Sequence, residues 1–174
     1  MTMRVDLTVV QAEPLRPEAF TPYGTVIQYS GEPRRQYVPE AFERIEDVAS
    51  PTLWLRRANR RAELPVTVTN LERHPYSAQT FLPVKDVSHL VVVAGSRADG
   101  TPDLDTLRAF IATGGQGVSY RRNVWHHGLT VLDGTADFIV VMSLTGRGDD
   151  DVFLDLAQPV EVRAPAGQPG GSHG

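Results

Sequence analysis

A carboxylate, an imidazole and a side-chain amide lie close together in the stretch NLERHPYSAQTFLPV, residues 70–84. Successive side chains on a strand point to opposite faces, so Glu72 and His74 share one face. Pro75 ends that strand, and a tight hairpin after it would bring Gln79 back beside these two side chains. Glutamate and histidine transfer protons in enzymes and bind metal ions. The spacing therefore predicts an acid–base site or a metal site.

A second group of polar side chains lies in GQGVSYRRNVWHHGL, residues 115–129. His126 and His127 are adjacent, so only one of them can face inward from a strand. Tyr120 and Asn123 in the same stretch are candidates for the wall of a substrate pocket. We therefore expect one of the two histidines to join the first group of residues, and the other to be structural or to lie at an interface.

Several cations are candidates for binding an anionic substrate. Lys85 follows the first stretch and is a candidate anchor for a carboxylate, although beside Asp86 it also fits an ordinary surface position. Arg57 ends the strand TLWLRR, which places it near the predicted mouth of a barrel, so we expect it to contact substrate. It belongs to an arginine cluster that is otherwise typical of a solvated face or loop: Arg56, Arg57, Arg60 and Arg61.

The elements that must position these residues are short strands. Gly or Pro recurs through most of the chain, and many short strands at such spacing are typical of an all-β sandwich or barrel. Asp133-Gly134 between two apolar runs predicts a hairpin. Short helical segments are predicted at 16–20 and 39–48, with a capped turn after Asp103. The β-prone runs are 5–10, 24–29, 52–57, 65–70, 77–83, 88–95, 107–113, 117–122, 129–134, 136–143 and 152–156.

The totals are those of one domain, and they exclude several classes of protein. The chain has 174 residues, of which we assign 1–163 to a single barrel domain and 164–174 to a disordered tail rich in Gly and Pro. A formal net charge of −4 argues against nucleic acid as a partner. The N-terminal stretch lacks the apolar core and cleavage site of a signal peptide, so none is expected, and no apolar run approaches the roughly 20 residues of a membrane helix. A cytoplasmic protein with no membrane partner is expected, and the absence of cysteine excludes thiolate metal sites.

The two polar stretches resemble the metal-site motifs of cupins. The first is similar to the motif His-x-His-x(3–4)-Glu, with Glu72 in the first His position and Gln79 in the Glu position. The second is similar to Gly-x5-Pro-x-Gly-x2-His, beginning at Gly115 and ending at His126. This resemblance assigns the inward role to His126 rather than to His127.

Four separated motifs, LERHP, QTFLPVK, LRAF and GQGVSYRRNVWHH, occur in the order typical of the ureidoglycolate lyase family, which the chain resembles from about Phe20 to Phe138. The resemblance implies a cupin-type double-stranded β-helix, or jelly-roll barrel, and a homodimer. It implies cleavage of (S)-ureidoglycolate to glyoxylate and urea in allantoin and purine-nitrogen catabolism. It also points to nickel or another first-row divalent ion as the metal. Gly128 follows the two histidines where some relatives have Pro.

Cleavage of ureidoglycolate requires removal of a hydroxyl proton, rupture of a C–N bond and protonation of the leaving nitrogen. Two mechanisms are open. In the first, Glu72, His74, Gln79 and His126 hold a divalent metal that activates the hydroxyl. In the second, no cofactor is needed: Glu72 and His126 move the protons, and Lys85 binds the substrate carboxylate.

Two other classes of function stay open, because cupin folds host many activities. One is a metal-dependent dioxygenase or isomerase that acts on another small hydroxy acid. The other is a non-catalytic barrel that binds a small acid. His74 alone would be interpreted as a core histidine. Glu72 is harder to explain in this way, because burying an unpaired carboxylate costs on the order of several kcal/mol of folding free energy.

Overall fold

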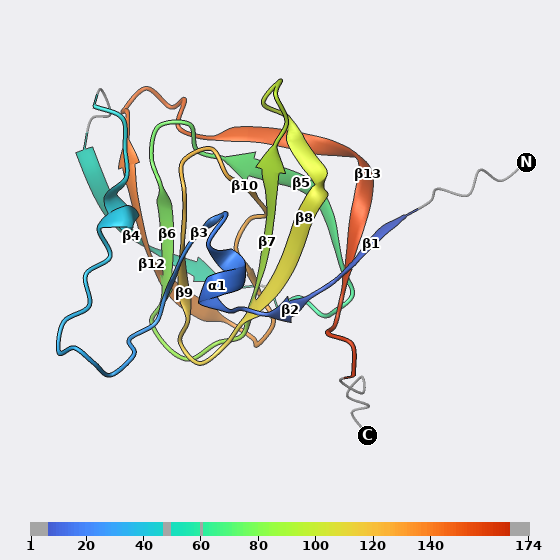
Figure 1. Cartoon of the computed structure of the whole chain (residues 1–174), viewed down its shortest axis with the longest axis horizontal. Helices are drawn as coiled ribbons and strands as arrows, with labels where there is room; N and C mark the ends of the chain where they lie inside the picture. The colour runs from blue at the N-terminus through green and yellow to red at the C-terminus, as the bar shows by residue number, and fades with distance from the viewer. Residues whose placement is uncertain (1–6, 47–49, 60, 168–174) are drawn as a thin grey trace, which may run out of the picture.

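The apolar runs of the sequence form strands in two sheets, which together make an all-β barrel (Figure 1). The computed structural model describes residues 7–46, 50–59 and 61–167. The predicted fold class, an all-β cupin-like barrel with short helical segments, is confirmed.

The larger sheet has the strand order β1-β13-β5-β10-β7-β8-β2, and β11 also pairs with β7. Because β1 pairs in parallel with β13, the described ends of the chain lie on the same side of the barrel (Figure 1). The strands of this sheet are β1 (Thr8–Gln11), β2 (Glu13–Pro14), β5 (Val66–Arg73), β7 (His89–Ser96), β8 (Pro102–Ala112), β10 (Trp125–His126), β11 (Thr130–Val131) and β13 (Val152–Arg163).

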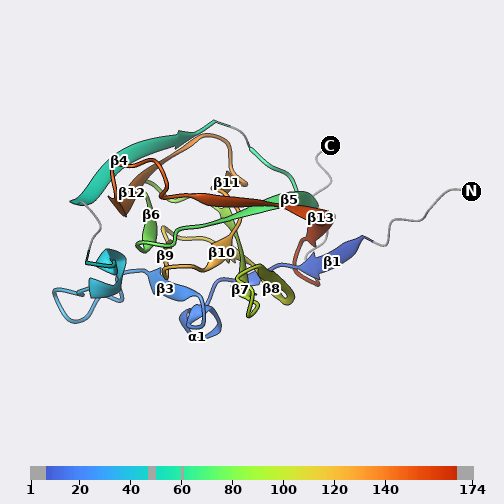
Figure 2. The same cartoon turned by 90° about the horizontal axis from the view of Figure 1, so that it is seen from above.

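The smaller sheet has the order β3-β9-β6-β12-β4, so β4 is an edge strand, and among the described strands it pairs with β12 alone. Seen from above, β4 and β12 curve over one end of the molecule, while β3 and α1 lie on the opposite side (Figure 2). Its strands are β3 (Gly24–Ile27), β4 (Ser50–Ala58), β6 (Gln79–Pro83), β9 (Gly117–Tyr120) and β12 (Ala136–Leu144).

Strand β7 is buried on both faces, which explains its unbroken apolar sequence. Val91 and Val93 point into a core between the two sheets, together with Phe81, Phe110 and Phe138. The alternate residues of β7 point into a second core, which the larger sheet encloses by curling back until β1 contacts β8. Fixed on both sides in this way, β7 supports β10, which carries one of the candidate histidines.

In the part of the chain that the structure describes, helical structure is limited to two short segments. The helix predicted at 16–20 is present as α1, Pro17–Phe20, and the segment predicted at 39–48 is a 3₁₀ helix over Pro39–Phe42, with residues 47–49 outside the described part. The turn predicted after Asp103 is wrong, because β8 continues through this position to pair with β7. Within the described residues, no helix is long and apolar enough to cross a membrane.

Two predicted hairpins are absent because the chain changes sheets at each turn. β5 belongs to the larger sheet and β6 to the smaller, so residues 74–78 cross between sheets instead of closing a tight hairpin. Gly134 does adopt a positive φ of 64°. However, β11 before it pairs with β7, and β12 after it pairs with β4 and β6.

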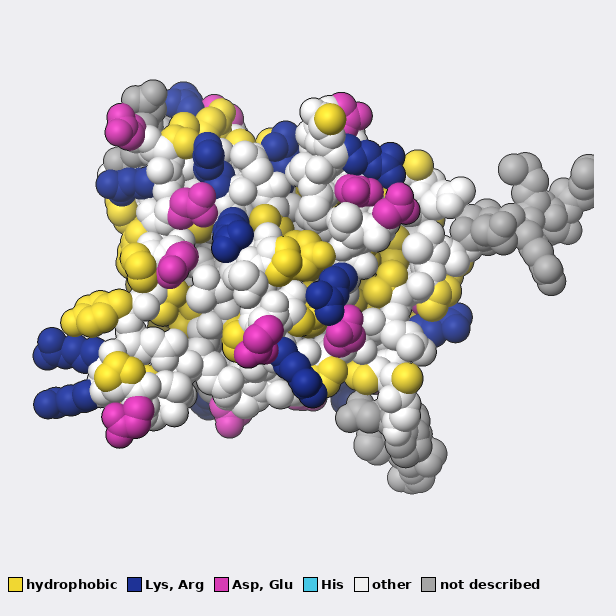
Figure 3. All heavy atoms as spheres, viewed as in Figure 1, with side chains coloured by type: hydrophobic (Ala, Val, Ile, Leu, Met, Phe, Trp, Pro, Cys, Tyr) yellow, Lys and Arg dark blue, Asp and Glu magenta, His cyan; other side chains and the backbone are white. Residues whose placement is uncertain are grey.

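The face shown in Figure 3 carries acidic and basic side chains interspersed, without a large field of one sign. No histidine is visible on this face, and His74, His89 and His126 are all buried. The predicted tail falls mostly on residues 168–174, which lie outside the described part of the chain. Within the described part, β13 ends at Arg163.

Candidate functional site

Glu72 and His126 are brought together by strand pairing. Glu72 on β5 and His126 on β10 are direct partners in the antiparallel register, so their side chains project from the same face. His74 follows the end of β5, and its ring centroid lies 5.1 Å from that of His126. One ligand atom from each of Glu72, His74 and His126 lies within 4.8 Å of the others. The three side chains predicted from two distant stretches therefore form one cluster.

Gln79 reaches this cluster from the opposite sheet, not from a hairpin. It begins β6, is 6% exposed, and its Oε1 lies 3.2 Å from Nε2 of His126. Its Nε2 lies 3.6 Å from the Sδ of Met142, which directs the amide oxygen toward the histidine. Gln79 therefore lies beside the cluster, as predicted, but it comes from a strand of the other sheet and not from a hairpin with β5.

His126 is held in one orientation and kept neutral. Its Nδ1 lies 3.0 Å from the backbone oxygen of Val124, and Tyr120 stacks on its ring at a centroid distance of 4.0 Å. A carbonyl oxygen only accepts hydrogen bonds, so Nδ1 donates and Nε2 presents a lone pair to the cluster. Burial, assisted by the neighbouring His74, lowers the pKa of His126 to about 3. At neutral pH this side chain therefore accepts and does not donate at Nε2.

His74 is oriented by an acidic loop that precedes β13. Its Nδ1 lies 2.9 Å from Oδ1 of Asp151 and 3.3 Å from the backbone oxygen of Asp150. Both of these oxygens accept, so Nδ1 donates to them. His74 Nε2 is buried and has no hydrogen-bond partner among the described residues. A carboxylate that orients a histidine in this way is the usual outer partner of a metal-binding histidine.

The cluster brings acceptor atoms together without a donor between them. Nε2 of neutral His126 faces Oε1 of Gln79 at 3.2 Å and Oε1 of Glu72 at 3.6 Å. The unpartnered Nε2 of His74 adds a further acceptor when that ring is neutral. A cation satisfies such an arrangement, and two imidazoles with one carboxylate are a donor set suited to first-row divalent ions. The residues of this site fit a divalent metal.

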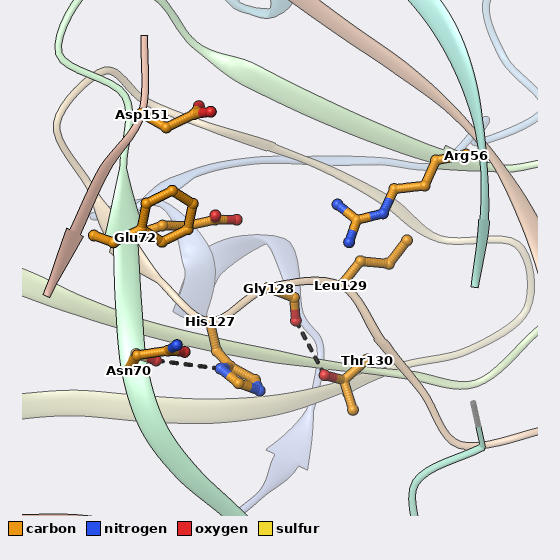
Figure 4. A pocket seen from close by; sticks show the side chains of 9 residues that line it. Arg56, Asn70, Glu72, His127, Gly128, Leu129, Thr130 and Asp151 are labelled. Atoms are coloured by element: carbon orange, nitrogen blue, oxygen red, sulfur yellow. Dashed lines mark hydrogen bonds between the residues drawn. The ribbon is translucent and has the colours of Figure 1, made fainter. Parts of the chain in front are cut away.

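Glu72 also forms part of a pocket of about 410 Å³ (Figure 4). Burial raises the pKa of its carboxyl group, partly offset by the charges of His74 and Arg56, while Asp151 adds to the increase. Its carboxylate therefore binds protons more readily than an exposed one. The pocket is lined by Arg56, Asn70, Glu72, His127, Gly128, Leu129, Thr130, Asp151 and Phe153.

Comparison with known proteins shows the family of the chain. The family model described as ureidoglycolate lyase matches residues 7–163. The chain belongs to the ureidoglycolate lyase family. A protein of Agrobacterium fabrum is 40% identical over 156 residues, covering 90% of this chain and 96% of that protein. The ureidoglycolate lyase of Burkholderia cepacia is 37% identical, covering 88% and 90%, and that of Escherichia coli O1:K1 is 41% identical, covering 82% and 89%.

In this member of the ureidoglycolate lyase family, Arg56 lines the pocket and Arg57, the arginine expected there from the sequence, does not. Arg56 pairs in register with Phe138 of β12, whose side chain is fully buried in the barrel core, so Arg56 faces inward and lines the pocket. Arg57 pairs with Asp137 on the outer face, and its Nε lies 2.7 Å from Oδ1 of Asp137. The structure therefore does not bring Arg57 to the site.

Three further residues predicted at the site do not line this pocket. Lys85 lines a separate pocket together with Arg57, and not the pocket of Glu72. Tyr120 does not line the pocket, but its ring stacks on the ring of His126. Asn123 fixes the loop between β9 and β10 against the end of β5. Its backbone N–H donates to the His74 carbonyl at 3.0 Å, and its Oδ1 accepts from Arg73 at 2.7 Å.

Sequence reasoning missed most of the lining residues, among them Asp151, His127 and Asn70. Asp151 lies in an acidic run, Asp149-Asp150-Asp151, which is typical of a solvated loop. In the structure its carboxylate lies beside His74, just before β13 begins. His127 was expected to be structural or at an interface, and its Nδ1 does lie 3.3 Å from the Asn70 carbonyl, but the ring also lines the pocket. Asn70 shares the Glu72 face by strand alternation, which was the one available signal in the sequence.

Proposed function

We propose that this chain is a ureidoglycolate lyase that cleaves (S)-ureidoglycolate to glyoxylate and urea. The observation that carries the proposal is the cluster of Glu72, His74, Gln79 and His126 beside a pocket in a member of this family. The pocket volume of about 410 Å³ accommodates a substrate of this size, and its wall supplies polar groups for both ends of the molecule.

Glu72 is the proposed general base. Its raised pKa brings the carboxyl group closer to neutral pH, where a base transfers protons most efficiently. The carboxylate takes the proton of the substrate hydroxyl, and the oxygen then forms a double bond to carbon. The C–N bond breaks, and its electron pair stays on the urea nitrogen. Glyoxylate is formed in this step.

The proton returns to the leaving nitrogen from Glu72 itself. Its acid form lies beside the departing urea, whereas His126 is neutral at Nε2 and has no proton to give there. One carboxyl group thus serves first as base and then as acid, so no net proton is consumed. The Nδ1 proton of His74 stays on the Asp151 side of the ring and fixes its orientation.

Glu72, His74 and His126, with Gln79, would hold a divalent first-row ion. Such an ion, when bound, supplies positive charge that lowers the pKa of the substrate hydroxyl and stabilises the charge formed during cleavage. Oε1 of Glu72 lies 3.6 Å from Nε2 of His126, and the other carboxylate oxygen is the one proposed to take the substrate proton.

The test is a direct assay of glyoxylate release from racemic ureidoglycolate by purified protein. We expect turnover of one enantiomer, loss of activity after chelation, and recovery when a divalent ion is added back. No release above the uncatalysed rate would reject the lyase. Consumption of oxygen, or isomerisation of another hydroxy acid, would instead support the other enzyme classes, and binding without turnover would support a small-acid-binding barrel. Full activity in metal-free protein would reject the metal.

Two properties accompany this proposal. We propose a homodimer, supported by the family and by Leu53 and Leu55, which are 64% and 72% exposed on the outer face of edge strand β4. Sedimentation analysis tests this, and a monomer at micromolar concentration would contradict it. A cytoplasmic location also stays a prediction, which fractionation of the producing cells would test.

A further inference from the structure

We propose that Arg56 binds the carboxylate of the substrate and thereby sets its orientation in the pocket, a role that rests on the proposed lyase function. The substrate is an anion, and the pocket already contains the carboxylates of Glu72 and Asp151. An anion entering beside two carboxylates is repelled unless a cation offsets their charge. Arg56 is the one Lys or Arg among the described residues that line this pocket.

The side chain of Arg56 is directed into the pocket by strand register. On β4, Trp54 and Arg56 pair with Val140 and Phe138 of β12, and these two β12 side chains are buried in the barrel core. Cross-strand partners share a face, so Arg56 projects inward at the barrel mouth. In Figure 4 its guanidinium extends from one wall of the pocket toward the carboxylate of Glu72 on the opposite wall.

The guanidinium of Arg56 is free to bind a ligand. It makes no hydrogen bond or ion pair with the described residues, whereas its neighbour Arg57 is paired with Asp137 and Arg73 with Asn123. It is not paired with Glu72, although its charge is near enough to lower the pKa of that carboxyl group against the effect of burial. An unpaired guanidinium in a pocket is suited to carboxylate binding, because its planar N–H groups match both oxygens.

This anchor would place the reacting carbon between Arg56 and Glu72. With the carboxylate on Arg56, the adjacent carbon bears its hydroxyl toward Glu72, the proposed base. The urea group would then extend toward the remaining wall, where Asn70 and Thr130 offer an amide and a hydroxyl (Figure 4). Three different groups on three sides of one carbon are also what discrimination between its enantiomers requires.

Binding of oxalurate tests the anchor without turnover, because oxalurate carries the same carboxylate and ureido groups but has a carbonyl in place of the carbinol carbon. Calorimetry would compare wild type, Arg56→Gln, Arg56→Lys and Arg57→Gln, all with the same metal content. We expect Arg56→Gln to weaken binding about 10- to 100-fold, as loss of a hydrogen-bonded charge does. Arg56→Lys should restore part of the affinity, because it keeps the charge but not the planar fork.

Arg57→Gln is the matched control, one position away on the same strand and facing outward. It should bind oxalurate as wild type does. The neutral amide of oxalurate is the second control, since its affinity should be equal in wild type and Arg56→Gln. Circular dichroism and thermal unfolding show whether each variant is folded.

Each outcome decides the anchor separately from the lyase. Equal oxalurate affinity in folded Arg56→Gln and wild type overturns the anchor, even if wild type cleaves ureidoglycolate. A loss in Arg57→Gln alone would overturn it in favour of the outer arginine, and an equal loss for the neutral amide would show that Arg56 acts on packing and not on charge. If oxalurate binding depends on Arg56 but wild type releases no glyoxylate, the anchor stands and the lyase function fails.

Discussion

Two pockets in this molecule contain similar residue types and differ in what those residues are bonded to. The pocket of Glu72 has a volume of about 410 Å³, and that of Lys85 about 360 Å³. In the second pocket two of the three aspartates are hydrogen-bonded: Asp137 binds Arg57 through two hydrogen bonds of 2.7 and 2.8 Å, and Asp133 accepts the Ser88 N–H at 2.9 Å. The cluster beside the first pocket has acceptors that face one another.

The pKa shifts in the two pockets have different physical causes. In the Lys85 pocket, hydrogen bonds from Arg57 and Ser88 lower the pKa values of Asp137 and Asp133, which stabilises the charged forms. In the cluster beside the Glu72 pocket, burial raises the pKa of Glu72 and lowers that of His126, which destabilises both charged forms. A buried group without a partner is one that a ligand, a proton or an ion can still stabilise, and this makes the first pocket the candidate functional one.

The sharpest way to break this contrast is to remove one carboxylate from each pocket. We expect Glu72→Gln to lower kcat about 10²- to 10⁴-fold, the usual contribution of a general base. Asp137→Asn in the other pocket should retain nearly full activity. The measurement is glyoxylate release at saturating ureidoglycolate, with metal content determined for each variant. Full activity in Glu72→Gln would contradict the proposed base.

A smaller effect is expected from the outer partner of His74. Asp151→Asn removes the carboxylate that orients the ring, and we expect the affinity for a divalent ion to fall about 10-fold or more. Competition with a chromogenic chelator measures this independently of activity. Asp149→Asn is the control, because Asp149 lies in the same acidic run but bonds to Thr145 and Arg147 instead. Equal affinities in all three proteins would remove Asp151 from the metal site.

His89 separates burial from function, since it is 1% exposed but lies outside both pockets. Burial lowers its pKa to about 4, below the ordinary 6.5. The unfolded chain therefore binds a proton that the folded chain does not, and stability falls as pH decreases from 6.5 toward 4. His89→Met should reduce this dependence by up to about 1.4 kcal/mol per pH unit and leave metal affinity unchanged.

Urea unfolding of metal-free wild type and His89→Met at several pH values between 4 and 7 checks this. His126 has a shift of the same sign and stays in both proteins, so it cancels in the comparison. Parallel pH profiles for the two proteins would mean that His89 does not titrate as its burial predicts.

The smallest effect is expected when the ion pair of the Lys85 pocket is removed and the free energy of unfolding is measured. Arg57 and Asp137 form an exposed ion pair, with 64% and 43% of their side chains accessible, and such pairs contribute little in water. Asp137→Asn should leave the urea midpoint unchanged within error at physiological salt. A clear loss that disappears at high salt would show that this pocket depends on its charges after all.

Local patterns in the sequence determined the types of residue in the site and much of its chemistry. Strand alternation places Glu72 and His74 on one face, and this needs only the period of a strand. The apolar runs between Gly and Pro residues predict an all-β barrel, and the resemblance to a family distinguishes His126 from His127. Each of these inferences depends on neighbours a few residues apart, or on motifs retained in order along the chain.

Only the tertiary structure decided which distant groups meet those residues. A shift of one residue in the pairing of β4 with β12 would turn Arg57 inward and Arg56 outward, and the sequence of β4 carries large side chains on both faces. The route of Gln79 through the second sheet, and the arrival of Asp151 beside His74, likewise depend on long-range strand pairing. Such pairing reflects the packing of the whole core, which no local pattern specifies.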